Sequence, residues 1–207
     1  ADLLSNAKFP VILNGAGVVL SDAIPASAVL AEKLSAPVCC GYQHNDAFPG
    51  THPLSVGPLG YNGSKAAMEL IAKADVVLAL GTRLNPFSTL PGYGVDYWPA
   101  KAKVVQVDIN PDRIGLTKKV SVAIQGDAKM VAEQLTEALE PTAGDIGRED
   151  RLALIQQTKS AWLQKLSSMD HEDDDPGTTW NARARDREPD RMSARMAWRA
   201  IQASLPE

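Results

Sequence analysis

Five short apolar runs constrain the fold of this chain more than any other feature of its sequence. Each is four to six residues long, is rich in β-branched side chains and has no consistently polar face. Strands of this kind occur in parallel sheets that helices cover on both sides. Segments with helical spacing lie between the runs, which indicates an α/β fold. The runs cover residues 9–13, 37–40, 75–80, 103–107 and 120–124.

We therefore expect a doubly wound, mainly parallel sheet of about six strands over residues 7–140, with helices on both faces. Pro25 lies in the first turn of an expected helix over residues 24–34, where its missing N–H costs nothing. Ser64 and Asp127 are candidate N-caps of two further helices. The apolar faces of these two helices comprise Met68, Ile71 and Ala72, and Val131, Leu135 and Leu139.

Two stretches depart from this alternation. Residues 41–63 form a long connection rich in glycine and proline, and so long a connection within a domain is usually functional. Residues 170–190 run from acids to arginines with almost no aliphatic side chains, which is typical of an exposed linker. An amphipathic helix is expected before this linker over residues 148–168, and Ser193 is a candidate N-cap of a last helix. The apolar face of the helix over 148–168 comprises Leu152, Ile155, Trp162 and Leu166.

These features predict three parts. Residues 1–140 form a central α/β domain, and residues 141–190 form a helical and irregular extension with the exposed linker. Residues 191–207 form the first helix of a truncated C-terminal cofactor-binding domain, since no strand follows that helix. The chain also starts with alanine rather than methionine, so we expect a fragment of a longer protein.

Charge and composition argue against several classes of function. The 207 residues carry a net charge of −4, so no basic field would recruit nucleic acid or an anionic membrane. No run approaches the roughly 18–20 apolar residues of a membrane span, and the first residues do not resemble a signal peptide. The only cysteines, Cys39 and Cys40, are neighbours and provide no disulfide framework. A cytoplasmic protein is expected.

The first strand leads into Gly15-Ala16-Gly17, where two glycines permit a ligand to approach backbone N–H groups at a helix start. The third glycine of the GxGxxG pattern would fall at position 20, which is leucine, and no acid lies near position 37 to hold a ribose. A standard nicotinamide site is therefore not expected. The alternative is a turn that needs its glycines only for its own geometry.

Two other strand ends carry candidate site residues, because ligands of open α/β sheets bind beyond the carboxyl ends of the strands. Arg83 follows the run 75–80 and is either a site residue or a solvated loop arginine. Asp108 could accept hydrogen bonds from ribose hydroxyls, or it could form the turn before Asn110. Gly126 and Asp127 could face an adenine, or Asp127 could only cap its helix.

No catalytic or metal-binding set is visible in the sequence. His44, His52 and His171 show no metal-ligand spacing with one another or with cysteine. The chain has no GxSxG elbow and no P-loop. We therefore predict that this chain contributes no catalytic residue and no metal ligand of its own.

The order of several motifs resembles the middle domain of thiamine-diphosphate enzymes, the group that includes acetohydroxyacid synthase, pyruvate oxidase and oxalyl-CoA decarboxylase. These motifs are FPVILNGAGV, GPLGYNGSKAAMELIAKADVVLALGTRL, KVVQVDINPDRIG and IQGDAK, and the resemblance covers about residues 7–140. Within the group, GYQHNDAFPGTHPLSV, GTRLNPFSTLPGYG and the tail from residue 173 are most similar to the sulfoacetaldehyde acetyltransferases.

The resemblance implies a parent enzyme that uses thiamine diphosphate and Mg²⁺ to convert sulfoacetaldehyde and phosphate to acetyl phosphate and sulfite. The family's catalytic glutamate lies in an N-terminal domain, and its metal and diphosphate motif lies in a C-terminal domain. Neither is in this chain, since the pairs Gly126-Asp127 and Gly144-Asp145 lack the rest of that motif. The resemblance thus implies an architectural domain that is inactive alone. Its expected partners are the N- and C-terminal domains of the parent enzyme, and the parent is expected to be a homo-oligomer.

In relatives this domain holds FAD, ADP or no nucleotide. Arg83 matches an arginine that lies along the dinucleotide of flavin-containing relatives, and the alternative is a pairing with an acid at a domain interface. Two other functions stay open: another thiamine-diphosphate enzyme of the acetohydroxyacid synthase type, and a free-standing nucleotide-binding module. The cofactor-binding residues that the strand ends and the resemblance indicate are Gly15, Ala16, Gly17, Gly81, Arg83, Asp108, Ile109, Gly126 and Asp127.

Overall fold

The structure is a computed structural model that describes residues 1–91, 94–171 and 194–205. It divides into two compact units, Ala1–Lys159 and Ser160–Glu207. The domain boundaries expected near residues 140 and 190 stay predictions. Ser193 and most of the expected linker, residues 172–190, lie outside the described residues.

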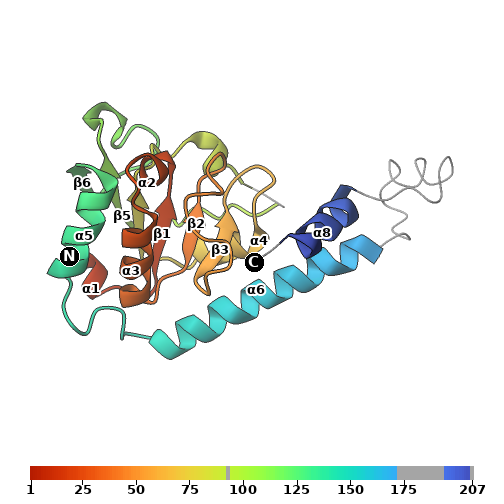
Figure 1. Ribbon diagram of the computed structural model, residues 1–207. Helices are drawn as coiled ribbons and strands as arrows, with labels where there is room; N and C mark the ends of the chain where they lie inside the picture. The colour runs from red at the N-terminus through yellow and green to blue at the C-terminus, as the bar shows by residue number, and fades with distance from the viewer. Residues whose placement is uncertain (92–93, 172–193, 206–207) are drawn as a thin grey trace. The chain divides into compact units, whose positions relative to one another are not determined.

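The first unit is built on one six-stranded sheet in which every strand pair is parallel. The strand order is β3-β2-β1-β4-β5-β6 (Figure 1), which confirms the predicted α/β fold. In the centre of the sheet Ile12 lies opposite Leu78, which lies opposite Val105. The strands are β1 (Pro10–Asn14), β2 (Val38–Cys40), β3 (Ser55–Pro58), β4 (Val76–Leu80), β5 (Lys103–Asp108) and β6 (Val122–Gln125).

Five strands occur where apolar runs predicted them, within two residues at either end. The sixth, β3, lies inside the connection over 41–63 that the sequence indicated to be irregular. Its sequence SVGP contains a glycine with φ +90° and a proline, both unusual in a strand. The edge position tolerates them, because β3 pairs only with β2 and the pairing shifts register beside Val38.

Two of the predicted helix caps are confirmed. The Ser64 hydroxyl accepts a hydrogen bond from the Ala67 N–H at 3.3 Å, and Asp127 Oδ1 accepts from the N–H groups of Lys129 and Met130 at 2.9 and 3.1 Å. The α-helices are α1 (Asp2–Ser5), α2 (Ala16–Leu20), α3 (Ile24–Leu34), α4 (Lys65–Ile71), α5 (Ala128–Ala138), α6 (Arg148–His171) and α8 (Ala194–Ser204). Two short 3₁₀ turns are η1 (Pro86–Ser88) and η2 (Pro111–Arg113).

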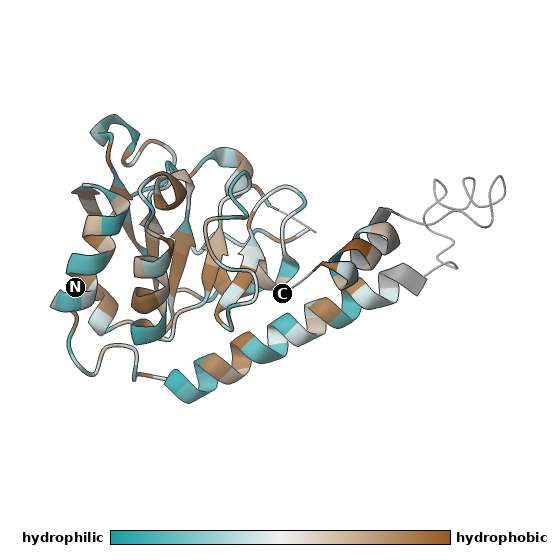
Figure 2. Cartoon of the chain, in the orientation of Figure 1, coloured by the Kyte–Doolittle hydropathy of each residue, from teal (hydrophilic) through white to brown (hydrophobic). Residues whose placement is uncertain are grey.

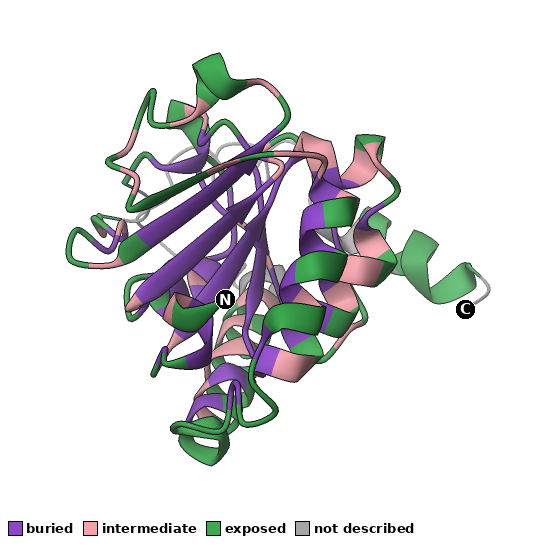
Figure 3. Ribbon diagram, turned by 90° about the vertical axis from the view of Figure 1, so that its left-hand side faces the viewer, coloured by how far each residue is buried: buried purple, intermediate pink, exposed green. Residues whose placement is uncertain are grey.

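The helices cover both faces of the sheet. Helices α2, α3 and α5 contact one another and form one layer, while α4 packs on β2 and β3. The right-handed rule for parallel crossovers places α4 on the opposite face, because its connection runs across the sheet in the reverse direction. Strands β1, β2, β4 and β5 form the apolar interior (Figure 2) and are buried over most of their length (Figure 3), whereas the edge strand β3 is partly exposed and the edge strand β6 mostly exposed.

The predicted apolar face of α5 is confirmed, that of α4 is confirmed except at Ala72, and that of α6 is confirmed only at Ile155. Val131, Leu135 and Leu139 of the α5 segment are buried, as are Met68 and Ile71 of α4. Ala72 is exposed because it lies at the end of α4, where the chain turns toward β4. In α6 Ile155 is buried, but Leu152 is 37% exposed and Trp162 and Leu166 are only half-buried. No helix in the described part of the chain is long and apolar enough to cross a membrane.

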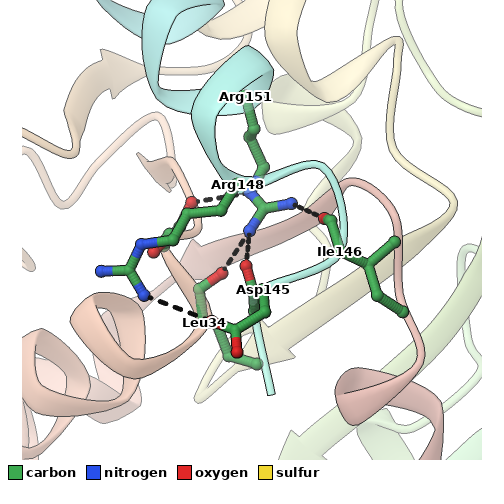
Figure 4. Close-up of polar contacts among 7 residues, drawn as sticks. Leu34, Asp145, Ile146, Arg148 and Arg151 are labelled. Atoms are coloured by element: carbon green, nitrogen blue, oxygen red, sulfur yellow. Dashed lines mark hydrogen bonds and ion pairs between the residues drawn. The ribbon is translucent and has the colours of Figure 1, made fainter. Parts of the chain in front are cut away.

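A buried arginine fixes the start of α6 to the sheet domain. Arg151 is only 2% exposed, and its guanidinium donates hydrogen bonds to five main-chain carbonyl oxygens (Figure 4). Burial lowers the pKa of Arg151 from its ordinary value. Arg148, one turn earlier, points away and pairs with Asp145 at 3.7 Å. The five oxygens belong to Lys8, Leu34, Ser35, Gly144 and Ile146.

Candidate functional site

A cleft of about 460 Å³ lies at the carboxyl ends of β1, β4, β5 and β6. Parallel strands end at the same edge of the sheet, so loops that are distant in sequence meet there. All nine residues predicted from the strand ends and the family resemblance line this one cleft. Whether they bind a nucleotide stays a prediction. The nine are Gly15, Ala16, Gly17, Gly81, Arg83, Asp108, Ile109, Gly126 and Asp127.

The glycines of the first turn face protein rather than open space. The Gly15 N–H donates to the Leu80 carbonyl at 3.0 Å, and the Gly17 N–H donates to the Gly81 carbonyl at 2.8 Å. A Cβ atom on Gly15 would lie 2.4 Å from the Thr82 Cβ, and one on Gly17 would lie 2.7 Å from the Gly81 Cα. The two turns after β1 and β4 therefore need glycine for their own close packing, which supports the structural alternative for this motif.

The loop after β4 is held by the side chain of Gln106, which is buried on β5. Gln106 Nε2 donates to the carbonyls of Thr82 and Arg113, at 3.1 Å each, and Oε1 accepts from the Gly115 N–H at 2.9 Å. One side-chain amide thus joins the loops after β4 and β5. The two loops carry Arg83 and Arg113, whose side chains both line the cleft.

Arg83 and Arg113 are both exposed. Within residues 1–91, 94–171 and 194–205, no acid lies within ion-pair distance of either guanidinium. The sequence indicated Arg83 but missed Arg113. The same rule could have found it, since Arg113 follows the end of β5 as Arg83 follows the end of β4.

The carboxylates of the two predicted acids differ in the hydrogen bonds that they already accept. Asp127 is the N-cap of α5, as its alternative interpretation proposed, and its Oδ1 accepts two backbone hydrogen bonds. Asp108 is 7% exposed, and its Oδ1 accepts the Asn110 N–H at 2.9 Å. That bond supports the turn interpretation of Asp108. The second carboxylate oxygen, Oδ2, forms no hydrogen bond with the described residues, so Asp108 can still accept from a ligand.

Aromatic side chains stand beside the cleft. Tyr42, which lines it, stacks on Phe87 with ring centroids 6.1 Å apart and meets Tyr61 edge-on at 6.3 Å. Ser88, next to Phe87 in the sequence, joins the loops of Phe87 and Tyr42, because its hydroxyl accepts a hydrogen bond from the Tyr42 N–H. The Ser88 carbonyl also accepts a hydrogen bond from the Tyr97 hydroxyl. Burial raises the pKa of Tyr97 to about 12. No sequence pattern indicates this cluster, because it depends on contacts between distant loops.

His44 and His52 each lie beside an acid, and both cysteines are buried. His44 pairs with Asp46 at 3.6 Å, and His52 contacts Glu32 at 3.2 Å. Burial, with a smaller effect from Asp46, raises the pKa of Cys40 to about 12, and burial raises that of Cys39 well above its ordinary value. Among the described residues, no three His, Cys, Asp or Glu side chains are grouped so that they could hold a metal ion.

Comparison with known proteins identifies the family. Residues 1–135 match the family described as "Thiamine pyrophosphate enzyme, central domain". The whole chain is 77% identical to a "Probable sulfoacetaldehyde acetyltransferase" of Rhizobium meliloti and 74% identical to a "Sulfoacetaldehyde acetyltransferase" of Roseovarius nubinhibens. It spans only 35% and 34% of the lengths of these two relatives.

More distant proteins agree with this match. A "Probable acetolactate synthase large subunit" of Methanocaldococcus jannaschii is 34% identical over 166 residues, which are 80% of this chain and 26% of that protein. The X-ray structure of a candidate thiamin diphosphate-dependent enzyme from Mycobacterium smegmatis matches with a TM-score of 0.55 and 28% identity. That match covers 68% of this chain and 27% of the other. The chain belongs to the family of thiamine pyrophosphate enzyme central domains.

Proposed function

We propose that this chain is the central domain of a thiamine-diphosphate-dependent sulfoacetaldehyde acetyltransferase. The parent enzyme would convert sulfoacetaldehyde and phosphate to acetyl phosphate and sulfite. The observation that carries the proposal is the identity of 74–77% over the whole chain to two relatives with this name. The acetolactate synthase is much less similar, at 34%, so acetolactate synthesis is the second candidate.

The residues that the structure describes do not fit thiamine diphosphate and Mg²⁺. A metal that bridges the cofactor's diphosphate to the protein needs several oxygen ligands held together. Asp127, in one Gly-Asp pair, is committed to capping α5, and Asp145, in the other, pairs with Arg148. The described residues contain no other group of potential metal ligands. We therefore assign the chain an architectural role between an N-terminal and a C-terminal domain, and no step of the reaction.

The test uses the full-length protein to which this chain belongs. Purified protein with thiamine diphosphate and Mg²⁺ is supplied with sulfoacetaldehyde and phosphate, and sulfite and acetyl phosphate are measured. Both products should form in equal amounts, and leaving out phosphate should prevent acetyl phosphate formation. A parallel assay supplies pyruvate and measures acetolactate. Acetolactate formation without sulfite release would replace the proposal with the second candidate.

We also propose that the cleft binds a nucleotide such as ADP or FAD. Three side chains support this: Arg83 and Arg113 offer charge for phosphates, and Asp108 Oδ2 can accept from ribose hydroxyls. The glycine turn contributes less than its sequence indicated, because the N–H groups of Gly15 and Gly17 are already bonded to carbonyls. The alternative is that Arg83 pairs with an acid of another domain.

Calorimetric titration with ADP and with FAD tests the nucleotide proposal. Asp108→Ala should weaken binding by about tenfold, as expected for a lost hydrogen bond to a charged group. Asp112→Ala is the matched control, since Asp112 is an exposed acid of the same loop that does not line the cleft. Equal binding by both variants would place the site elsewhere. No binding to the unaltered chain would leave a purely structural domain.

A free-standing nucleotide-binding module is the remaining alternative, and activity of the full-length protein would exclude it. The homo-oligomeric parent and the cytoplasmic location expected from the sequence stay predictions.

A further inference from the structure

Three aromatic side chains form an exposed cluster beyond the carboxyl ends of β2, β3 and β4. Tyr42 follows β2, Tyr61 follows β3 and Phe87 follows β4. The centroid of the Tyr42 ring lies 6.1 Å from that of Phe87 and 6.3 Å from that of Tyr61. Tyr61 is 63% exposed and Phe87 is 55% exposed. We call these three rings the aromatic cluster.

The backbone beneath the aromatic cluster is held by contacts between the loops that carry it. The Tyr61 N–H donates a hydrogen bond to the Phe87 carbonyl at 3.1 Å, and the Tyr42 N–H donates to the Ser88 hydroxyl at 3.0 Å. Gly60 packs against the Phe87 carbonyl so closely that no Cβ atom would fit between them. Three loops therefore meet at one point, which presents the rings in a fixed arrangement.

The folding of this domain does not account for the exposed rings. An apolar side chain stabilises a fold by leaving water, whereas more than half of Tyr61 and of Phe87 stays in water. Neither of these two rings lines the cleft, so a ligand there would not cover them. The hydroxyl groups of Tyr42 and Tyr61 form no hydrogen bond with the residues that the structure describes. Tyrosines with a fixed ring and an available hydroxyl are typical of protein interfaces, because they bury an apolar body and pair a polar tip.

The protein to which the chain belongs supplies a partner for this surface. The chain makes up only 35% and 34% of two relatives that are 77% and 74% identical to it over its whole length. Most of such a protein therefore lies outside this chain. A domain on the same polypeptide is held at a high effective concentration, so a small apolar surface is enough to dock it. Nucleic acid is a poor partner in comparison, because the chain has a net charge of −4 and the aromatic cluster contains no cation.

We propose that the aromatic cluster is a docking surface for a neighbouring domain of the parent enzyme. That domain covers the rings of Tyr61 and Phe87 with apolar side chains and offers hydrogen-bond acceptors to the Tyr42 and Tyr61 hydroxyl groups. This inference rests on one part of the proposed function, that the chain is the central domain of a longer protein. It adds the residues through which the architectural role is carried out. Aromatic side chains that become fully buried carry a large share of the binding energy of an interface.

Hydroxyl-radical labelling, read by mass spectrometry, measures whether the rings meet solvent. It is applied to the 207-residue chain and to the full-length protein, both without added nucleotide. In the isolated chain Tyr61 and Phe87 should be labelled readily, whereas the buried Tyr97 should not. In the full-length protein the labelling of Tyr61 and Phe87 should fall to the low rate of Tyr97.

Phe87→Ser in the full-length protein gives a second measurement. Loss of this ring should weaken docking, so that the labelling of Tyr61 rises toward its rate in the isolated chain. Leu116→Ser is the matched control, because Leu116 is 72% exposed and lies in the loop after β5, outside the aromatic cluster. Tyr61 should stay protected in this control. Urea unfolding of both variants of the isolated chain checks that they are folded, which is expected because both side chains are mostly exposed.

Three results would overturn the inference. Tyr61 and Phe87 could be labelled equally in both proteins, which would show that no domain covers them. The isolated chain could sediment as a dimer in which both rings are protected, which would make a second copy the occupant. FAD added to the isolated chain could protect both rings, which would assign the aromatic cluster to a ligand site.

A sulfite-release assay on the same full-length sample separates this inference from the proposed function. Sulfite release without protection of the rings would leave the proposed function standing and remove the docking surface. Protection of the rings without sulfite release would support the docking surface and contradict the proposed acetyltransferase.

Discussion

The Gly17 N–H donates a 2.8 Å hydrogen bond to the carbonyl oxygen of Gly81, and the two α-carbons face each other so closely that neither residue can carry a side chain. Gly17 belongs to the turn after β1 and Gly81 to the turn after β4, and β1 and β4 are neighbours in the centre of the sheet. The bond joins these two turns at the floor of the cleft. The contact also explains Gly17, one of the two glycines that resemble a ligand-binding motif, by packing within the protein.

This contact predicts that Gly17→Ala destabilises the domain. The new Cβ would lie 2.7 Å from the Gly81 Cα, which is backbone and cannot rotate away. Overpacking of this kind costs about 1–3 kcal/mol of the free energy of unfolding. Gly50→Ala is the control, because no atom lies within 4 Å of its new Cβ. Urea unfolding measures both, and equal stability of the two variants would contradict the close approach.

Arg151→Met should destabilise the domain by at least about 3 kcal/mol. The substitution keeps a long side chain but leaves five carbonyl oxygens without their donor, and each unsatisfied buried polar group costs about 1–3 kcal/mol. Arg148→Met removes the same charge from an exposed side chain that pairs with Asp145, so its loss should stay within about 1 kcal/mol. Urea unfolding midpoints compare the two. Similar values would mean that Arg151 does not hold α6 to the domain.

The parts of the fold that the sequence predicts well are those that depend on local patterns. Five strands, the caps at Ser64 and Asp127 and the parallel arrangement follow from side-chain type, alternation and capping chemistry within short segments. The edge strand β3 was missed because SVGP has little strand character, and its pairing with β2 determines its conformation.

The gathering of strand-end residues into one cleft was also predictable, because parallel topology brings those ends together. The contacts that each of these residues makes were not predictable. Arg151 contacts Lys8, which is 143 positions away in the sequence, and Gln106 joins two loops by contacts that no spacing rule describes. Glycine motifs are ambiguous for the same reason, since a glycine that admits a ligand and one that admits a neighbouring backbone look alike in sequence.

Alkaline pH should destabilise the domain between about pH 9 and pH 12. Burial raises the pKa of Cys40 from its ordinary value of 9.0 to about 12, and that of Tyr97 from 10.0 to about 12. The folded state thus keeps both groups protonated after the unfolded chain has ionised. Their stabilising contribution is complete below pH 9 and is lost as the pH rises toward 12. One pKa unit corresponds to about 1.4 kcal/mol, so the loss should reach a few kcal/mol.

Urea midpoints from pH 7.5 to pH 11.5 measure this loss. Lysine ionisation contributes to the same range, so the decisive comparison is with Tyr97→Phe, which cannot ionise at this position. The variant should have a lower urea midpoint at pH 7.5, because its hydrogen bond to the Ser88 carbonyl is gone. It should lose less stability than the unaltered chain between pH 10 and pH 11.5. Parallel curves for the two proteins would show that Tyr97 titrates normally.

The 207-residue chain alone should neither bind thiamine diphosphate tightly nor form acetyl phosphate. The carboxylates of both Gly-Asp pairs are occupied, Asp127 by the first turn of α5 and Asp145 by Arg148, and the described residues offer no group of metal ligands to anchor a diphosphate through Mg²⁺. The cofactor also needs a carboxylate beside its aminopyrimidine, which the family resemblance assigns to another domain. Calorimetry with thiamine diphosphate and Mg²⁺, followed by a sulfite-release assay, provides the measurement, and the full-length protein is the positive control. Micromolar binding, or sulfite release above a buffer blank, by the isolated chain would show that part of the catalytic site lies within it.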